Sequence, residues 1–267
     1  MIPTMLSVMT FNLRLDWAQD RPNHWEARRP LFQQVLQLYP ADVLAFQEVM
    51  PNQHQDLVAM LPDYAWHGRG REPLGDGEGC YVFWDCRRLE AVFQETFWLG
   101  PDPAQPGRAW DAGCPRICNH VLLMDSGQEI HFYNVHMDHV GVMARQKSAE
   151  LVRRHMSEID APAVLLGDFN VERVLESLSA LQGLQDCFAV HGSDQEGTFH
   201  GFHGVPTLGP IDYVLTTADF EVDFCQRITD RWEGIYPSDH FGLLARLELK
   251  SRARRDGKGG STPPARV

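Results

Sequence analysis

Apolar residues in this chain form short, nearly continuous runs that polar segments separate. Such runs are typical of strands that are buried on both faces. They predict strands over residues 5–12, 41–49, 80–84, 91–98, 116–124, 129–136, 163–166, 210–216, 220–225 and 240–249. Ser126-Gly127 between two of these runs indicates a hairpin. Because hairpins occur beside strand–helix alternation, we predict an α/β fold with mixed sheets rather than a doubly wound parallel sheet.

Helical patterns occur in four segments. Asn23 and Glu26 have the spacing of a capping box, and the helix expected from there toward Leu38 is kinked or delayed by Pro30. Further helices are predicted over residues 51–61, 142–159 and 172–181. The 142–159 pattern places basic side chains on its solvent face, namely Arg145, Lys147, Arg153 and Arg154. Loops are expected at the glycine-, proline- and charge-rich segments 68–79 and 100–113.

Composition is compatible with one sizeable α/β domain, because 43% of the 267 residues are hydrophobic. The chain has no run of eighteen apolar residues, so no membrane span is expected, and its first residues do not resemble a signal peptide. Its six cysteines form no CxxC pair. This favours free thiols in a reducing compartment, the cytoplasm, over a zinc site made of cysteines.

The formal net charge of −12 is unevenly distributed along the chain. Residues 250–267 carry six basic side chains and one acidic one, which leaves a net charge of −17 on residues 1–249. We interpret residues 250–267 as a basic disordered tail and residues 1–249 as one folded domain, which we expect to be monomeric. So acidic a domain repels polyanions unless cations bind to it, which disfavours nucleic acid as a partner without excluding it.

Polar side chains of a restricted kind stand where the predicted strands begin or end. The run 163–166 stops at Gly167, and Asp168 and Asn170 follow, so both could face one ligand, although alone they fit a turn equally well. The complete set is Asn12, Glu48, His136, Asp168, Asn170, Asp212, Asp239 and His240. Oxygen ligands of this kind suit Mg²⁺ or Mn²⁺, and histidine with aspartate can move protons and orient a nucleophilic water. We therefore predict a metal-assisted site of the kind that cleaves phosphate esters.

The segments that hold these residues occur in the order seen in the endonuclease/exonuclease/phosphatase superfamily, the DNase I-like group. They are Thr10-Phe11-Asn12, Phe46-Gln47-Glu48-Val49, Asn134-Val135-His136, Gly167-Asp168-Phe169-Asn170, Ile211-Asp212-Tyr213 and Ser238-Asp239-His240. The chain resembles this superfamily over residues 5–249, which implies that residues 1–249 form a catalytic domain of this kind. Finer features, such as His136-Met137-Asp138-His139, resemble a bacterial branch of metal-dependent hydrolases. The resemblance implies a four-layered α/β sandwich, in which two mixed sheets lie face to face with helices outside and the site lies at one edge.

The resemblance also implies catalytic roles. Asp168 would orient or deprotonate the attacking water. Asn170 would hold the phosphate or fix the geometry on the side of the metal ion. His240, held and charged by Asp212, would stabilise the phosphoryl oxygens or act as a base. The pairing agrees with physical expectation, since a carboxylate beside an imidazole favours the protonated ring. His136 would contact the scissile phosphate or protonate the leaving group.

For the metal, Mg²⁺ or Mn²⁺, the resemblance implies Glu48 as the principal carboxylate, with Asn12 and Asp239 completing or supporting the shell. Further residues near these motifs are weaker candidates for substrate binding, because surface or loop positions explain them as well. These candidates are Arg14, Glu78, Arg116, Asp138 and His139.

Four functions compete at this point. The first is a Mg²⁺- or Mn²⁺-dependent phosphoesterase acting on a small or medium phosphorylated substrate, including nucleotides, and the second is a nuclease with the same chemistry. The acidic domain favours the first. A zinc hydrolase of the metallo-β-lactamase type is a third, but Asn134 stands where its motif needs a histidine. The intact motif set argues against the fourth, a non-catalytic binding domain.

Overall fold

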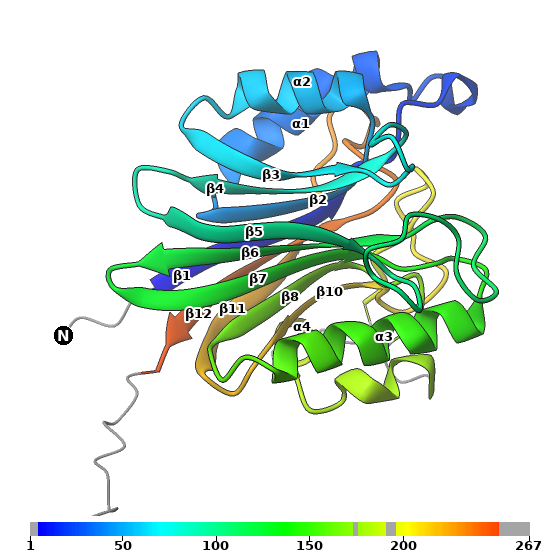
Figure 1. The fold of residues 1–267 in the computed structure, drawn as a ribbon. Helices are drawn as coiled ribbons and strands as arrows, with labels where there is room; N and C mark the ends of the chain where they lie inside the picture. Colours follow the sequence, from blue (N-terminus) through cyan, green and yellow to red (C-terminus); the bar gives the residue numbers. More distant parts are fainter. Residues whose placement is uncertain (1–4, 173–175, 191–195, 251–267) are drawn as a thin grey trace, which may run out of the picture.

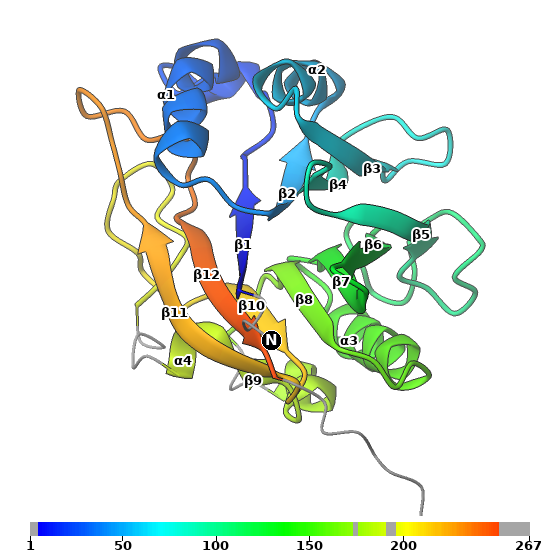
Figure 2. The ribbon, with the colours of Figure 1, turned by 90° about the vertical axis from the view of Figure 1, so that its left-hand side faces the viewer.

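The computed structural model describes residues 5–172, 176–190 and 196–250. Two six-stranded sheets lie face to face with helices on their outer sides, which gives four layers (Figures 1 and 2). The first sheet has the order β11 (Phe220–Ile228), β12 (Gly242–Leu249), β1 (Met5–Asn12), β2 (Val43–Val49), β4 (Gly79–Asp85) and β3 (Tyr64–Gly70). The second has the order β5 (Glu90–Trp98), β6 (Ile117–Asp125), β7 (Gln128–His136), β8 (Ala163–Asp168), β10 (Asp212–Thr216) and β9 (Gln185–Asp186). The predicted four-layered sandwich is confirmed.

The sheets are mixed because each contains a parallel pair beside antiparallel neighbours. β1 is parallel to β2, and α1 (Trp25–Leu38) lies between them in the chain. In the same way β7 is parallel to β8, and α3 (Val142–Ser157) connects them. α1 and α2 (Pro51–Met60) cover the outer side of the first sheet, whereas α3 covers the outer side of the second (Figure 2). The carboxyl ends of these paired strands therefore meet at one edge of the sandwich.

The central strands are apolar on both faces, which explains their nearly continuous apolar sequences. In β1, Leu6 and Val8 point into the layer between the sheets, whereas Met9 and Phe11 point outward toward the helices. Phe11 packs edge-to-face against Phe32 of α1, with ring centroids 5.3 Å apart. Alternate residues of a strand thus point into different layers. The same alternation sets the direction of the polar side chains at the strand ends.

Several predicted local features are wrong. α1 begins at Trp25 and its cap is His24, whose Nδ1 accepts a hydrogen bond from the Ala27 amide at 3.2 Å, so Asn23 and Glu26 do not form its capping box. The helix continues through Pro30 without a later start. The predicted loop 68–79 begins inside an edge strand, β3, which glycine and charge obscure in the sequence.

Two further expectations concern helices in the second half. Arg145 is buried rather than on the solvent face of α3, because its Nη1 donates to the Asp138 carbonyl at 2.7 Å. The helix predicted over 172–181 is a 3₁₀ helix, η2 (Glu176–Leu181), preceded by residues outside the described part. The short elements η1 (Ala18–Asp20) and α4 (Cys187–Val190) complete the list. Within the described ranges, no helix is long and apolar enough to cross a membrane. The tail 251–267 lies outside the described residues.

Candidate active site

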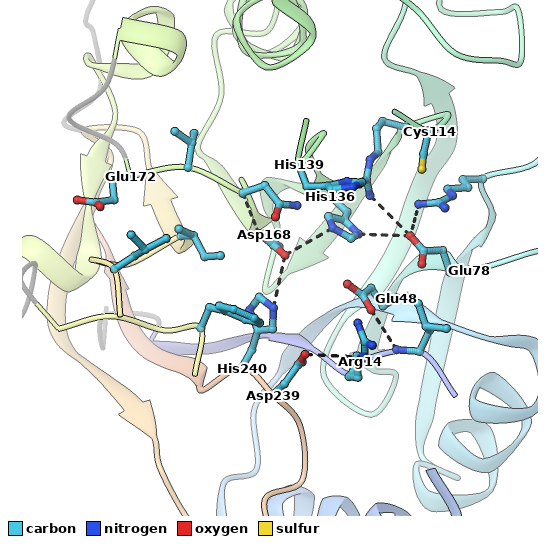
Figure 3. Close-up of a pocket in the computed structure, with 18 residues that line it drawn as sticks. Arg14, Glu48, Glu78, Cys114, His136, His139, Asp168, Glu172, Asp239 and His240 are labelled. Atoms are coloured by element: carbon cyan, nitrogen blue, oxygen red, sulfur yellow. Dashed lines mark hydrogen bonds and ion pairs between the residues drawn. The ribbon is translucent and has the colours of Figure 1, made fainter. Parts of the chain in front are cut away.

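The alternation of side chains along the strands brings the predicted residues together at one end of the layer between the sheets. Asn12, His136 and Asp168 each continue the inward-facing series of their strands, β1, β7 and β8. Asp212 begins β10 and is the register partner of Asp168. All four residues are buried, with exposed fractions of 6% or less. Figure 3 shows Asp168 between His136 and His240, with a dashed line to each of them.

Glu48 reaches the same place through an irregularity in its strand. The register between β2 and β4 shifts between Phe46 and Val49, and Glu48 has a positive φ of 57°. A bulge of this kind redirects a side chain that simple alternation would send to the other face. The Glu48 carboxylate accepts hydrogen bonds from the Leu15 amide and the Asn12 side chain, both at 3.1 Å. The backbone therefore fixes this carboxylate at the mouth of the site.

The Asn12 side chain links two of the carboxylates. Its Nδ2 donates to Glu48 at 3.1 Å and to Asp168 at 2.9 Å, and its Oδ1 accepts from the Arg14 amide at 2.9 Å. Asn12 is fully buried and does not line the cleft. Its amide therefore holds Glu48 and Asp168 side by side.

Asp168 is the centre of the site. One oxygen lies 3.5 Å from His136 Nε2 and 3.9 Å from His240 Nε2, and the other accepts a hydrogen bond from the Asn170 amide at 2.8 Å. Burial, with the nearby charge of Asp212, raises the pKa of Asp168 to about 7. A carboxyl with such a pKa can exchange a proton near neutral pH.

His240 and Asp212 form a buried ion pair. His240 Nδ1 lies 2.9 Å from the Asp212 carboxylate, whose other oxygen is buried and has no hydrogen-bond partner among the described residues. Burial opposes a charge on His240, but the Asp212 carboxylate overcomes this effect and raises the pKa of His240 to about 10. The ring therefore carries a positive charge at neutral pH, and its Nε2 faces Asp168.

His136 has the opposite electrostatic character. Its pKa lies well below the usual value because of burial and the positive charges of Arg116 and Arg71. Its Nδ1 lies 3.8 Å from the Glu78 carboxylate, on the side away from Asp168. The site thus contains one neutral and one charged imidazole on two sides of the same aspartate.

The weaker candidates separate into two groups. Arg14, Glu78, Arg116 and His139 line the cleft, whereas Asp138 does not. The Asp138 carboxylate instead accepts hydrogen bonds from the amides of Gly113, Cys114, Val140 and Gly141, and it lies 3.5 Å from Arg116 Nε. Burial would raise its pKa, but these amide donors hold the pKa at about 2. Asp138 therefore joins two loops beneath the cleft wall.

The rim of the cleft is lined by paired charges. Arg14 binds Asp20 at 2.7 Å and lies 3.8 Å from Asp239. On the opposite wall, Glu78 forms an ion pair with Arg71 and lies 3.6 Å from Arg116. Arg14 and Arg116 were expected near the site from the motifs. Arg71 was not singled out, and only its position in a charged loop could have suggested it.

The cleft has a volume of about 660 Å³, within the usual range for small-molecule sites. Its lining combines most of the predicted polar residues, without Asn12, Asp138 and Asp212, with Arg71, Glu172 and an apolar wall that strand-end reasoning did not identify. The apolar part consists of Leu15, Cys114, Val171, Phe199, Leu208 and Ile211. Asn170 lines the cleft while its Nδ2 donates to the Met137 carbonyl at 3.0 Å. Side chains from loops, and not only from strand ends, therefore decide the shape of the site.

The donor atoms fit a divalent cation. Ligand atoms of Glu48, His136 and Asp168 lie within 4.8 Å of one another. Asp239 is buried beside them, and burial raises the pKa of its carboxyl. A negative charge is costly at this buried position, and a bound cation would reduce that cost. Carboxylate oxygens are the ligands that Mg²⁺ and Mn²⁺ prefer.

Comparisons with known proteins agree with this architecture. The profile of the Endonuclease/Exonuclease/phosphatase family matches residues 9–240. A family protein from Bacteroides thetaiotaomicron is 32% identical with a TM-score of 0.87, and the match covers 93% of this chain and 96% of that one. A mannosyl-6-phosphatase from the same organism is also 32% identical, with a TM-score of 0.85 and coverage of 91% and 99%.

More distant proteins share the fold. TDP2 from D. rerio, in complex with a single-strand DNA product, is 18% identical with a TM-score of 0.75, covering 91% of this chain and 99% of that one. A comparison with curated proteins gave no match.

Proposed function

This chain belongs to the endonuclease/exonuclease/phosphatase family of phosphoester hydrolases, and from that premise we propose that it is a Mg²⁺- or Mn²⁺-dependent phosphoesterase acting on a small phosphorylated substrate. The observation that carries the proposal is the position of Asp168. Its carboxylate lies between a neutral imidazole, His136, and a charged one, His240, with Glu48 held beside it by Asn12. This arrangement offers a base, a cation-binding carboxylate and a phosphate-binding charge at one point.

In this proposal Glu48 and Asp239 hold the metal ion, supported by Asn12. When bound, the ion supplies positive charge that polarises the phosphoryl group and neutralises the charge that develops on it. The three side chains come from β1, β2 and the segment before β12, so the first sheet would carry the metal. Asp168 and His136 come from the second sheet. The two sheets therefore bring the cation-binding carboxylates of one sheet beside the proton-handling groups of the other.

The remaining residues handle the water and the phosphate. Asp168 orients a water molecule for attack on phosphorus and takes its proton, for which a pKa of about 7 is suitable. The charged His240, held by Asp212, stabilises the phosphoryl oxygens. His136 is neutral at pH 7, which favours its role as a hydrogen-bond donor to the phosphate over its role as an acid. The phosphorus–oxygen ester bond breaks as the new one forms, the leaving oxygen takes up a proton from solvent water, and Asp168 returns the proton it accepted to solvent.

Two observations support a small substrate. The cleft volume of about 660 Å³ suits a small molecule, and the net charge of −17 on residues 1–249 opposes the approach of a long polyanion. The mannosyl-6-phosphatase that is 32% identical over nearly its whole length acts on a phosphorylated sugar. We therefore rank sugar phosphates first and oligonucleotides last. We also propose a cytoplasmic location, which the six free cysteines support.

A substrate panel with matched variants tests this function. Sugar phosphates, nucleotides, phosphodiesters and oligonucleotides are assayed with Mg²⁺ and with Mn²⁺. We expect hydrolysis of a small phosphate ester, and a fall in rate of roughly 10²-fold or more in Asp168→Ala and His240→Ala. Asp223→Ala, an exposed position on β11, is the control and should keep the wild-type rate.

Three results would count against the proposal. Wild-type rates in both cleft variants would refute the site. Preferential cleavage of oligonucleotides would favour the nuclease alternative instead. No hydrolysis of any phosphoester with either metal would favour a binding domain.

A further inference from the structure

A second group of histidines lies on the outer face of the second sheet, under α3. We call Glu95, His120, His131, Tyr133 and His155 the outer cluster. Glu95 of β5 is the register partner of His120 of β6, which is the register partner of Tyr133 of β7, so these side chains share one face. His155 reaches them from the last turn of α3. None of the five lines the cleft.

Three atoms of the outer cluster converge on one point. Glu95 Oε1 lies 3.1 Å from His120 Nδ1 and 3.0 Å from His155 Nε2, and ligand atoms of the three residues all lie within 4.8 Å of one another. Zinc binds nitrogen and oxygen at about 2.0–2.2 Å, so the edges of a tetrahedral site are roughly 3.3–3.5 Å long. The two separations from Glu95 Oε1 differ from those edges by only a few tenths of an ångström, and the two imidazole nitrogens lie within 4.8 Å of each other.

The other ring nitrogens are held by neighbouring side chains. His120 Nε2 lies 2.8 Å from His131 Nδ1, and His155 Nδ1 lies 3.2 Å from the Tyr133 hydroxyl. The His120 ring also stacks on Tyr133, and the His155 ring on Phe97, with centroids 4.4 and 4.9 Å apart. Metal-binding histidines are typically oriented in this way by a partner on the nitrogen that does not bind the metal.

Charge and access also fit a metal ion. His120 and His131 are buried, and burial favours the neutral imidazole, the form that binds metals. The side chains of Glu95 and His155 are 35% and 28% exposed, which leaves a route from solvent. Without a metal, each ring can donate to Glu95. With a metal, the proton of each ring would move to the nitrogen that faces His131 or Tyr133.

We propose that Glu95, His120 and His155 form a second metal site, which takes Zn²⁺ or a similar transition-metal ion with water as a further ligand. Two imidazoles and one carboxylate suit Zn²⁺ better than Mg²⁺, which prefers oxygen ligands. The bound ion fastens the end of α3 to β5 and β6. Because α3 connects β7 to β8, it thereby steadies the two strands that end in His136 and Asp168.

Zinc titration of the full chain, in the presence of excess Mg²⁺, tests this site. Binding is followed calorimetrically, and Co²⁺ absorption reports the ligand geometry. We expect one Zn²⁺ whose affinity falls at least tenfold in His155→Ala and in Glu95→Gln. Both side chains are partly exposed, so these variants should fold, and retained circular dichroism verifies this. His203→Ala, an exposed histidine, should bind as the wild type does.

Variants of the cleft distinguish this site from the active site. Asp168→Ala and Glu48→Gln should retain the Zn²⁺ that His155→Ala loses. Unchanged affinity in His155→Ala and Glu95→Gln would overturn the proposal. So would loss of zinc only in the cleft variants, or the absence of zinc binding by the wild-type chain.

Discussion

The cleft and the outer cluster both combine imidazoles with carboxylates, and β7 contributes to both, but their electrostatics differ. In the cleft, Glu48, Asp168 and Asp239 crowd together, and Asp212 behind His240 has a buried oxygen with no hydrogen-bond partner in the part of the chain that the structure describes. In the outer cluster, a single carboxylate, Glu95, faces two imidazoles. Crowded buried carboxylates are costly unless a cation or protons neutralise them, whereas the outer cluster is compensated by hydrogen bonds. This difference in charge balance suits the cleft to a reaction and the outer cluster to a structural role.

The largest expected effect on the rate comes from neutralising Asp212, the carboxylate beside His240 in the cleft, and not Glu95, the carboxylate of the outer cluster. Asp212→Asn removes the charge that keeps His240 protonated, so kcat should fall roughly 10²-fold. Because the raised pKa of His240 drops in this variant, its deficit relative to wild type should grow as the pH rises from about 6 toward 9. Glu95→Gln should change kcat less than twofold. The measurement is a pH–rate profile of both variants. Similar losses of activity in Asp212→Asn and Glu95→Gln would contradict the distinction between the two sites.

A smaller effect is expected where a carboxylate only joins loops. The pKa of Asp138 in the folded chain, about 2, lies below its unfolded value. Its ionised form therefore stabilises the fold above about pH 4, and this stabilisation is lost as the pH falls through about 2. Asp138→Asn should lower the free energy of unfolding by about 2 kcal/mol at pH 7.

The same variant should differ less from wild type at low pH, if the chain still folds there. Denaturant unfolding at pH 7 and near pH 3 measures both values. A difference that does not change with pH would mean that the ionised carboxylate of Asp138 is not the stabilising group.

The smallest effect concerns the partner of a proposed zinc ligand. Tyr133→Phe removes the hydroxyl that lies 3.2 Å from His155 Nδ1 and leaves the stacked ring in place. Such outer partners typically change metal affinity 10- to 100-fold, so the zinc affinity should weaken about tenfold while the rate of hydrolysis is unchanged. Equal zinc affinity in Tyr133→Phe and wild type would show that the hydroxyl does not orient His155.

The fold and most of the cleft follow from local sequence patterns. Buried strands give continuous apolar runs, and Asn12, His136 and Asp168 simply continue the inward parity of those runs. The direction of Glu48 could not be predicted in the same way, because it depends on a bulge and a positive φ. Simple alternation would have directed Glu48 outward, and only the order of the superfamily motifs identified it as a candidate.

Features that depend on distant contacts could not be predicted. Arg145 has the spacing of a solvent-facing residue, yet it is buried by a bond to the Asp138 carbonyl. The outer cluster is formed by the register of three strands and one helical turn, so no spacing along the chain marks Glu95, His120 and His155 as neighbours. Local sequence patterns predict the strands and helices and the face to which each side chain points. The register between strands and the contacts of loops become visible only in the folded chain.

The central claim is that a divalent ion held by Glu48 serves the reaction at Asp168. Its most direct test is the Mg²⁺ and Mn²⁺ dependence of the rate for the best substrate of the panel, measured for wild type and for Glu48→Gln. We predict that chelation abolishes wild-type activity, that Mg²⁺ or Mn²⁺ restores it, and that Glu48→Gln needs at least tenfold more metal for half-maximal rate. Activity that survives chelation, with the same metal dependence in Glu48→Gln and wild type, would contradict the claim.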